Sequence, residues 1–146
     1  MFVFYDMTDL LLLQLTKVLP SLNVPILVAK GKLKYHNNNT IYKINDLGDK
    51  GLIVIKELDD EGYEFVLSNR KEFAAAGSAL LEIFYLCKTN NAILIVDEEE
   101  ILIRDFANKL QVRTSTLDEF NQVTVNNKEY FEFINEMKKD KQRLNL

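Results

Sequence analysis

The stretch that most constrains the fold is a run of five apolar residues, Ala92–Val96, which ends in four consecutive carboxylates. An uninterrupted apolar run of this kind predicts a strand buried on both faces, as in a parallel sheet with helices on either side. Ligands bind such sheets outside the carboxyl ends of the strands, which is where Asp97 stands. Alternatively, the acids form the solvated first turn of the next helix, where negative charge suits the helix dipole. The run alone favours neither interpretation.

The composition limits the kinds of site that the chain can form. Its 146 residues include one cysteine, Cys87, and one histidine, His36, and the formal net charge is −4. A lone cysteine excludes a disulfide framework and a thiolate zinc site within the chain, and a lone histidine excludes two-histidine metal sites. A negatively charged chain is not expected to hold nucleic acid through a broad basic surface. An enzyme that holds cations in an acidic pocket and meets nucleic acid locally remains compatible with this charge.

The beginning of the chain lacks the features of an export signal. Met1–Tyr5 is apolar, but no basic region precedes it and Asp6 follows at once. No apolar run approaches the ~20 residues that a membrane-spanning helix needs. We therefore expect a cytoplasmic protein with no membrane partner.

Strand-like and helix-like segments alternate along the chain. Besides the central run, strands are predicted at residues 2–5, 24–28, 52–55 and 111–113, and helices at 9–19, 68–89, 101–110, 117–121 and about 128–142. Residues 29–51 are polar and turn-prone, and residues 30–50 form either a remodelled helical arm or a loop. Residues 59–67 form either a hairpin turn and strand or a loop leading into a helix. This alternation predicts an α/β fold, a three-layer sandwich with a mostly parallel central sheet flanked by helices.

The final predicted helix has an apolar face and a basic end. Asn126 is its expected cap, and its inward residues are expected to be Tyr130, Phe131, Phe133, Ile134 and Met137. The basic end consists of Lys138, Lys139, Lys141 and Arg143. Cations there suit the helix dipole, and contact with nucleic acid or a partner protein is the alternative.

Two of the predicted strands end in an aspartate. Asp6 follows residues 2–5, and Asp97 follows Ala92–Val96. In a parallel sheet both carboxylates would lie at the same edge. Mg²⁺ and Mn²⁺ prefer oxygen ligands, and either ion can activate a water that hydrolyses a phosphodiester. The pattern therefore predicts a divalent-cation site formed by Asp6 and Asp97.

The same residues resemble the PIN-domain ribonucleases, and most closely the prokaryotic branch found in toxin–antitoxin pairs. Asp6–Leu11 resembles the family's first acid and the turn into its first helix, and Val24–Val28 resembles its second strand. Ser78–Arg113 followed by Thr114-Ser115-Thr116 resembles its later half. The resemblance implies one PIN-like domain over residues 1–146, with residues 30–66 divergent.

The resemblance also implies a function. It implies an endoribonuclease dependent on Mg²⁺ or Mn²⁺, with RNA as substrate, an antitoxin-like partner and a homo-oligomeric state. Catalytic roles fall on Asp6, Asp97, Glu82 and Glu98, metal binding on Asp6 and Asp97, and substrate binding on Thr8, Lys30 and Thr114.

The chain departs from the family pattern at two acidic positions. Ala29–Lys32 stands where the family has an acid on the helix after the second strand, and Gly77–Ala79 stands where another acid opens a later helix. Glu82, about one turn further on, is the nearest carboxylate. Three hypotheses stay open: an active metal-dependent ribonuclease, a catalytically inactive PIN-like interaction or regulatory module, and an unrelated α/β domain whose strand-end acids cap helices.

Overall fold

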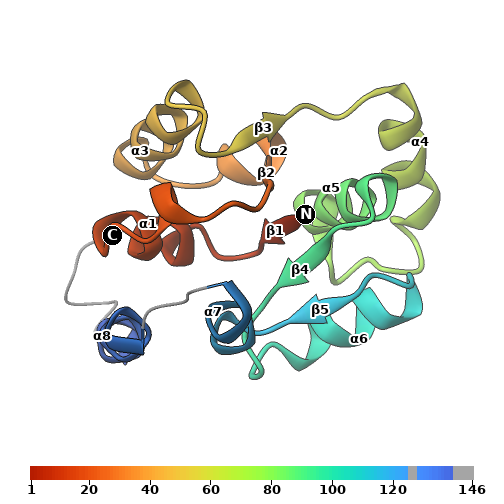
Figure 1. Ribbon diagram of the computed structural model, residues 1–146. Coiled ribbons are helices and arrows are strands. Elements are labelled where there is room, and N and C mark those ends of the chain that lie inside the picture. Colours follow the sequence, from red (N-terminus) through yellow and green to blue (C-terminus); the bar gives the residue numbers. More distant parts are fainter. Residues whose placement is uncertain (125–127, 140–146) are drawn as a thin grey trace.

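The computed structural model describes residues 1–124 and 128–139. Within these ranges five strands form one sheet in the order β3-β2-β1-β4-β5, and every neighbouring pair is parallel (Figure 1). The strands are β1 (Phe2–Phe4), β2 (Ile26–Ala29), β3 (Val54–Lys56), β4 (Ile93–Ile95) and β5 (Thr114–Ser115).

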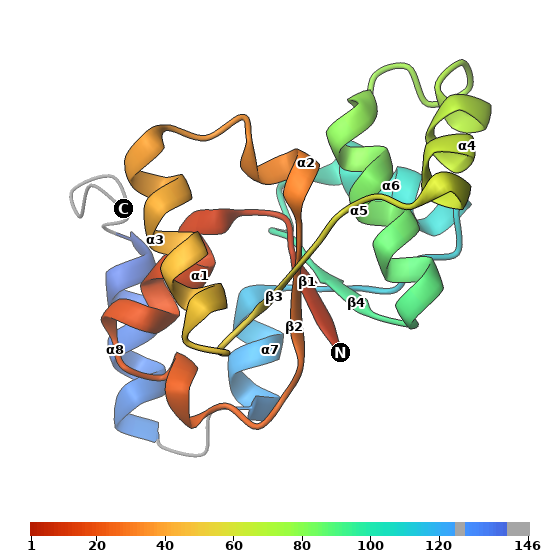
Figure 2. The same cartoon turned by 90° about the horizontal axis from the view of Figure 1, so that it is seen from above.

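Helices cover both faces of this sheet, as Figure 2 shows. The helices are α1 (Met7–Leu15), α2 (Lys30–Leu33), α3 (Asn38–Asp49), α4 (Asp60–Asn69), α5 (Gly77–Asn90), α6 (Ile101–Lys109), α7 (Leu117–Thr124) and α8 (Lys128–Lys139), with a 3₁₀ turn, η1 (Leu19–Ser21). Helices α1, α3, α7 and α8 lie on one side, and α4, α5 and α6 lie on the other. None of the described helices is both long and apolar enough to cross a bilayer.

The strands divide their side chains between two cores. Phe4 and Ile95 point into the core shared with α1, α3, α7 and α8. Val3 and Leu94 point into the core shared with α4, α5 and α6. Successive strand residues alternate between the faces of a sheet, so a strand covered on both sides must be apolar at every position. The predicted α/β class and the helix-flanked, largely parallel sheet are confirmed.

The strand order places the two predicted acids side by side. Strand β1 pairs with β4 in the register Phe4↔Ile95, and the Tyr5 N–H donates to the Ile95 carbonyl at 3.0 Å. Asp6 and Asp97 each stand two residues beyond this pair. Because β1 has β2 on one side and β4 on the other, the chain changes direction across the sheet between β1 and β4. Open α/β sheets bind ligands at such a switch point.

Of the two alternatives for residues 30–50, the helical arm is confirmed and the loop is wrong, because most of that segment forms α2 and α3. The Asn37 side chain caps α3 by accepting from the Thr40 N–H at 2.8 Å. Thr40, Ile44 and Leu47 then fall on one buried face at helical spacing. The three asparagines that suggested a turn include this cap and the first helical residues, because asparagine favours both turns and helix N-termini.

Residues 59–67 begin a helix, so the hairpin alternative is wrong and the helical alternative is confirmed. Asp59 caps α4 through the Gly62 N–H at 2.7 Å. The helix predicted over 68–89 is interrupted, because α4 ends at Asn69 and α5 begins at Gly77, whose φ is +77°. The last strand lies at Thr114–Ser115 and not at 111–113.

Helix α8 is present, but its apolar face is narrower than predicted. Ile134 is fully buried and Met137 packs against the same core. Tyr130 and Phe133, which were predicted to face inward, are each 47% exposed. The side chain of Phe131, the cap Asn126 and the basic residues Lys141 and Arg143 lie outside what the structure describes.

Candidate functional site

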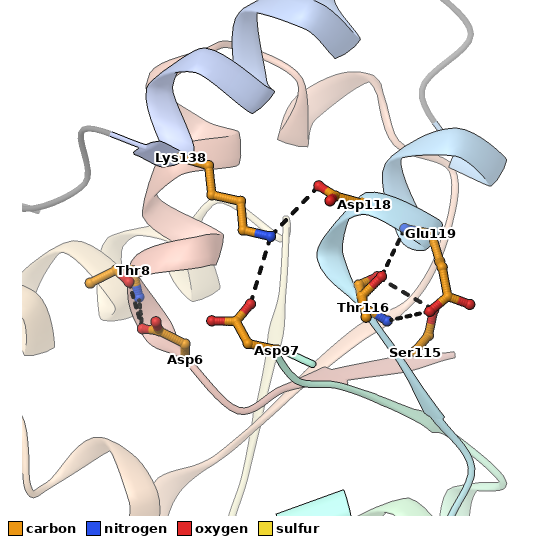
Figure 3. Close-up of polar contacts among 8 residues, drawn as sticks. All are labelled: Asp6, Thr8, Asp97, Ser115, Thr116, Asp118, Glu119 and Lys138. Atoms are coloured by element: carbon orange, nitrogen blue, oxygen red, sulfur yellow. Dashed lines mark hydrogen bonds and ion pairs between the residues drawn. The ribbon is translucent and has the colours of Figure 1, made fainter. Parts of the chain in front are cut away.

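Asp6 is held at the end of β1 by its role as a helix cap. Its Oδ1 accepts from the Thr8 backbone N–H at 2.9 Å and from the Thr8 hydroxyl at 2.5 Å (Figure 3). A capping side chain satisfies an N–H group that the first turn of the helix leaves without a partner. Thr8, predicted to bind substrate, therefore fixes the orientation of Asp6.

Asp97 follows β4 and faces a lysine from a distant part of the sequence. The Lys138 ammonium, in the last turn of α8, lies 3.7 Å from Asp97 Oδ1 and 3.6 Å from Asp118 Oδ1 (Figure 3). Asp97 Oδ1 is shielded from solvent and has no hydrogen-bond partner among the described residues. At this separation two opposite charges attract by about 4 kcal/mol at an effective dielectric constant of 20, before desolvation is subtracted. We call the group formed by Asp6, Asp97, Asp118 and Lys138 the carboxylate edge.

Asp118 is positioned by a reciprocal cap at the start of α7. The Thr116 hydroxyl accepts from the Glu119 N–H at 3.1 Å, and the Glu119 carboxylate accepts from the Thr116 N–H at 3.2 Å. This capping box sets the first turn of α7, which carries Asp118. The sequence analysis missed Asp118, although the T-x-x-E spacing just after a strand is a usable signal.

A cavity of about 310 Å³ opens at this edge. Its lining comes from the ends of β4 and β5 and from α7 and α8: Asp97, Glu98, Glu99, Thr116, Asp118 and Lys138. Glu98, predicted to be catalytic, is exposed and belongs to this lining. The four acids after β4 lie before α6, which starts at Ile101 and has no acid in its first turn. The alternative that these acids form the first turn of the next helix is therefore wrong.

The other predicted site residues lie elsewhere. Glu82 points toward α2, where its Oε1 accepts from the Gly31 N–H at 3.2 Å. Lys30 forms an exposed ion pair with Glu57. Thr114 lies in β5 opposite Leu94. The structure therefore groups Asp97 with Glu98 and leaves Glu82, Lys30 and Thr114 out of the cavity lining.

The donor set at the carboxylate edge does not fit a resident Mg²⁺ or Mn²⁺ in this arrangement. Such ions take six oxygen ligands in octahedral geometry, from carboxylates and from water. Among the described residues no group of three or more His, Cys, Asp or Glu side chains is placed to hold a metal. A positive charge already lies between Asp97 and Asp118, on Lys138. Asp97 and Asp118 thus share one positive charge that the protein itself supplies.

Cys87 takes no part in this site. It is buried in the core on the α5 side of the sheet, and burial raises the pKa of its thiol to about 12. A thiol with such a pKa carries almost no reactive thiolate at neutral pH. Cys87 is therefore a packing residue of that core.

Comparison with known proteins gives no family for this chain. No family model, no curated protein and no solved structure matches the chain.

Proposed function

We propose that this chain is a PIN-like domain that acts as a non-catalytic interaction or regulatory module. One observation carries the proposal: the Lys138 ammonium lies between the Asp97 and Asp118 carboxylates, where a nuclease of this kind would need a divalent cation. Two further features support it. The second acidic position of the family is replaced by Ala29–Lys32, and Glu82 bonds to the Gly31 N–H instead of reaching the cavity.

The PIN-like part of the proposal rests on where two aspartates stand at the edge of the sheet. Asp6 and Asp97 end two neighbouring parallel strands at the switch point, which is the placement that the resemblance predicts. In this arrangement Thr8 orients Asp6, the capping box orients Asp118, and Lys138 offsets part of the negative charge of Asp97 and Asp118. Such a site keeps its geometry without a metal, and it presents a fixed pattern of charge to a partner.

A second candidate is a Mg²⁺- or Mn²⁺-dependent ribonuclease. The placement of Asp6 and Asp97 after two neighbouring strands favours it, because these are two of the acids that such a site would need. In this case Lys138 would have to leave the edge before metal could enter. Glu98, which lines the same cavity, would be the nearest additional ligand.

The two candidates differ in their response to Mn²⁺. Thermal melts of the full chain are recorded with and without millimolar Mn²⁺, alongside cleavage of a labelled mixed-sequence RNA. The proposed module gives no shift in Tm and no cleavage, because a ligand stabilises a protein only when it binds the native state. A Mn²⁺-dependent rise in Tm together with cleavage, both lost in Asp97→Asn, would establish the ribonuclease and refute the module.

A further inference from the structure

Helix α6 lies beside β5, the strand at one edge of the sheet (Figure 1). A cavity of about 420 Å³ opens here, and its lining includes Arg104 and Asn108 of α6, Arg113 just before β5, and Thr114 in this strand. The carboxylate edge lies beyond the other end of β5, and the two cavities share no lining residue. The cavity beside α6 is therefore a separate candidate site.

The turn that ends α6 brings these residues together. Gln111 adopts the left-handed conformation, with a φ of +60°, and its N–H donates to the Asn108 carbonyl at 3.0 Å. A left-handed residue at this position ends a helix and turns the chain back. Arg113 and Thr114 consequently line the same cavity as Arg104 and Asn108, which are one helical turn apart on α6.

Arg113 is held in place by neutral oxygens. Its Nη2 donates to the Asn91 backbone carbonyl at 3.0 Å and to the Asn91 side-chain oxygen at 3.2 Å. Asn91 ends α5 in the left-handed conformation, so both acceptors belong to a fixed turn. Neither contact compensates the positive charge of Arg113. A guanidinium has five N–H donors, so Arg113 keeps donors for a ligand.

Arg104 carries a donor that no described residue uses. Its Nη1 is shielded from solvent and has no hydrogen-bond partner within residues 1–124 and 128–139. In the same ranges Arg104 and Arg113 form no ion pair. A charged donor that is removed from water without an acceptor is unfavourable. An oxyanion bound in the cavity would supply the missing acceptor.

The charge of the lining also favours an anion. Asp105 is the only acid among the described lining residues, and it is exposed and pairs with neither arginine. The lining therefore carries two positive charges against one negative charge. Since Asp105 repels an anion, its removal should strengthen binding, which gives the test an arm of opposite sign.

We propose that this cavity binds the phosphate group of a small phosphorylated molecule, with Arg104 and Arg113 as the two cationic contacts. Arginine pairs with phosphate oxygens through two parallel hydrogen bonds. The amides of Asn108 and Gln111 and the hydroxyl of Thr114 add neutral donors to the lining. Phosphate is preferred to carboxylate because three terminal oxygens use more of these donors than two.

The size and charge of the surroundings point to a small molecule. A volume of about 420 Å³ falls within the roughly 300–1,000 Å³ of small-molecule sites, which leaves room for the group that bears the phosphate. A nucleic-acid backbone is held by many cationic contacts. Here two arginines line the cavity, in a chain with a formal net charge of −4.

The test is an NMR titration of the ¹⁵N-labelled full chain at constant ionic strength. Inorganic phosphate and methyl phosphate, both largely dianionic above pH 7, shift the resonances of Arg104 and Arg113 with a Kd on the order of 1 mM. Dimethyl phosphate, which models the diester of a nucleic-acid backbone, binds about tenfold more weakly or less, because it has one charge and one terminal oxygen fewer. Methyl phosphate binds as tightly as inorganic phosphate, because the cavity has room for the ester group.

Variants assign the binding to the two arginines. Arg104→Met keeps the apolar stem, removes the charge and weakens both phosphate probes about tenfold or more, whereas Arg104→Lys keeps the charge without the fork and loses less. Asp105→Asn strengthens binding by about threefold, and this arm does not depend on how Arg104→Met folds. Lys109→Met removes one positive charge from an exposed residue of α6 outside the lining and leaves the Kd unchanged.

Four results would each overturn the proposal. They are an absence of shifts at both arginines with both phosphate probes, affinities that Arg104→Met and Asp105→Asn leave unchanged, dimethyl phosphate or a short single-stranded RNA binding in preference to methyl phosphate, and inorganic phosphate binding while methyl phosphate is excluded. Because the cavity shares no residue with the carboxylate edge, the proposed function stands or fails separately.

Discussion

Replacing Lys138 with methionine tests whether this lysine acts as the cation of the carboxylate edge. Methionine keeps the length and apolar stem of lysine and removes the ammonium. The wild-type ammonium is 3.7 Å from Asp97 and 3.6 Å from Asp118, and its side chain is 26% exposed. The substitution therefore leaves two neighbouring carboxylates without their shared positive charge.

The expected loss of stability is modest, because solvent screens part of each pair. The Asp97 and Asp118 side chains are 37% and 53% exposed. Exposed ion pairs contribute about 0.2–1 kcal/mol each, so we expect Lys138→Met to cost about 1–2 kcal/mol, including repulsion between the carboxylates. For a chain of this size that corresponds to a fall in Tm of roughly 3–6 °C. Lys139→Met, on the neighbouring exposed residue, is the matched control and should leave Tm unchanged.

Mn²⁺ should then stabilise the variant and not the wild-type protein. If the freed carboxylates bind Mn²⁺ with a Kd of about 0.1 mM, 1 mM Mn²⁺ adds about 1.4 kcal/mol, or roughly 4 °C in Tm. Adding Asp97→Asn to Lys138→Met should remove this response. The reasoning is refuted if Lys138→Met melts like the wild-type protein, or if the wild-type protein responds to Mn²⁺ as strongly as the variant.

Two further predictions follow from contacts outside the carboxylate edge. A Cβ on Gly31 would lie 1.8 Å from Glu82 Oε2, so Gly31→Ala should displace that flexible side chain and cost about 1 kcal/mol; in a Glu82→Ala background, chemical denaturation should show no cost. The Tyr85 hydroxyl donates to Asp59 at 2.7 Å and is the main cause of the lowered pKa of that carboxyl. A lowered pKa stabilises the fold above the unfolded-state value near 4, and this stabilisation is lost as pH falls through the folded-state pKa. Tyr85→Phe should therefore melt below the wild-type protein at pH 7, and the difference should shrink toward pH 3; a constant difference would contradict this assignment.

The sequence predicted best the elements whose apolar pattern fits only one kind of secondary structure. Ala92–Val96 is apolar at every position, and its centre forms β4, the strand between β1 and β5. Polar segments were harder, since their residue types serve two structures. Asn37 caps α3 with the same side chain that would have formed a turn, and Asp59 caps α4 where a hairpin was also considered. Apolar residues at helical spacing, such as Ile44 and Leu47, are what distinguishes the helix α3 from a turn.

The carboxylate edge was predictable only in part. The neighbouring positions of Asp6 and Asp97 follow from two strand-end acids and from the rule that parallel strands end at one edge. Lys138 could not be placed this way, because its position depends on how α8 packs against α1 and α7. That packing follows from tertiary contacts such as the burial of Ile134, which no local pattern near Asp97 encodes.

Under the proposed function, the position of Lys138 also bears on the two positions where the chain departs from the acidic pattern of the PIN-domain ribonucleases that it resembles. Removing acids from a metal site weakens its hold on a divalent cation, yet the remaining carboxylates still repel one another. A lysine brought in by a separate helix relieves that repulsion with one positive charge, and two partners at 3.6 and 3.7 Å are enough to hold it. Under the proposed function, the absence of acids at those two positions and the presence of Lys138 are therefore parts of one electrostatic arrangement. If that is correct, Asp118→Asn alone should not create a Mn²⁺ response, whereas adding it to Lys138→Met should weaken the response of that variant.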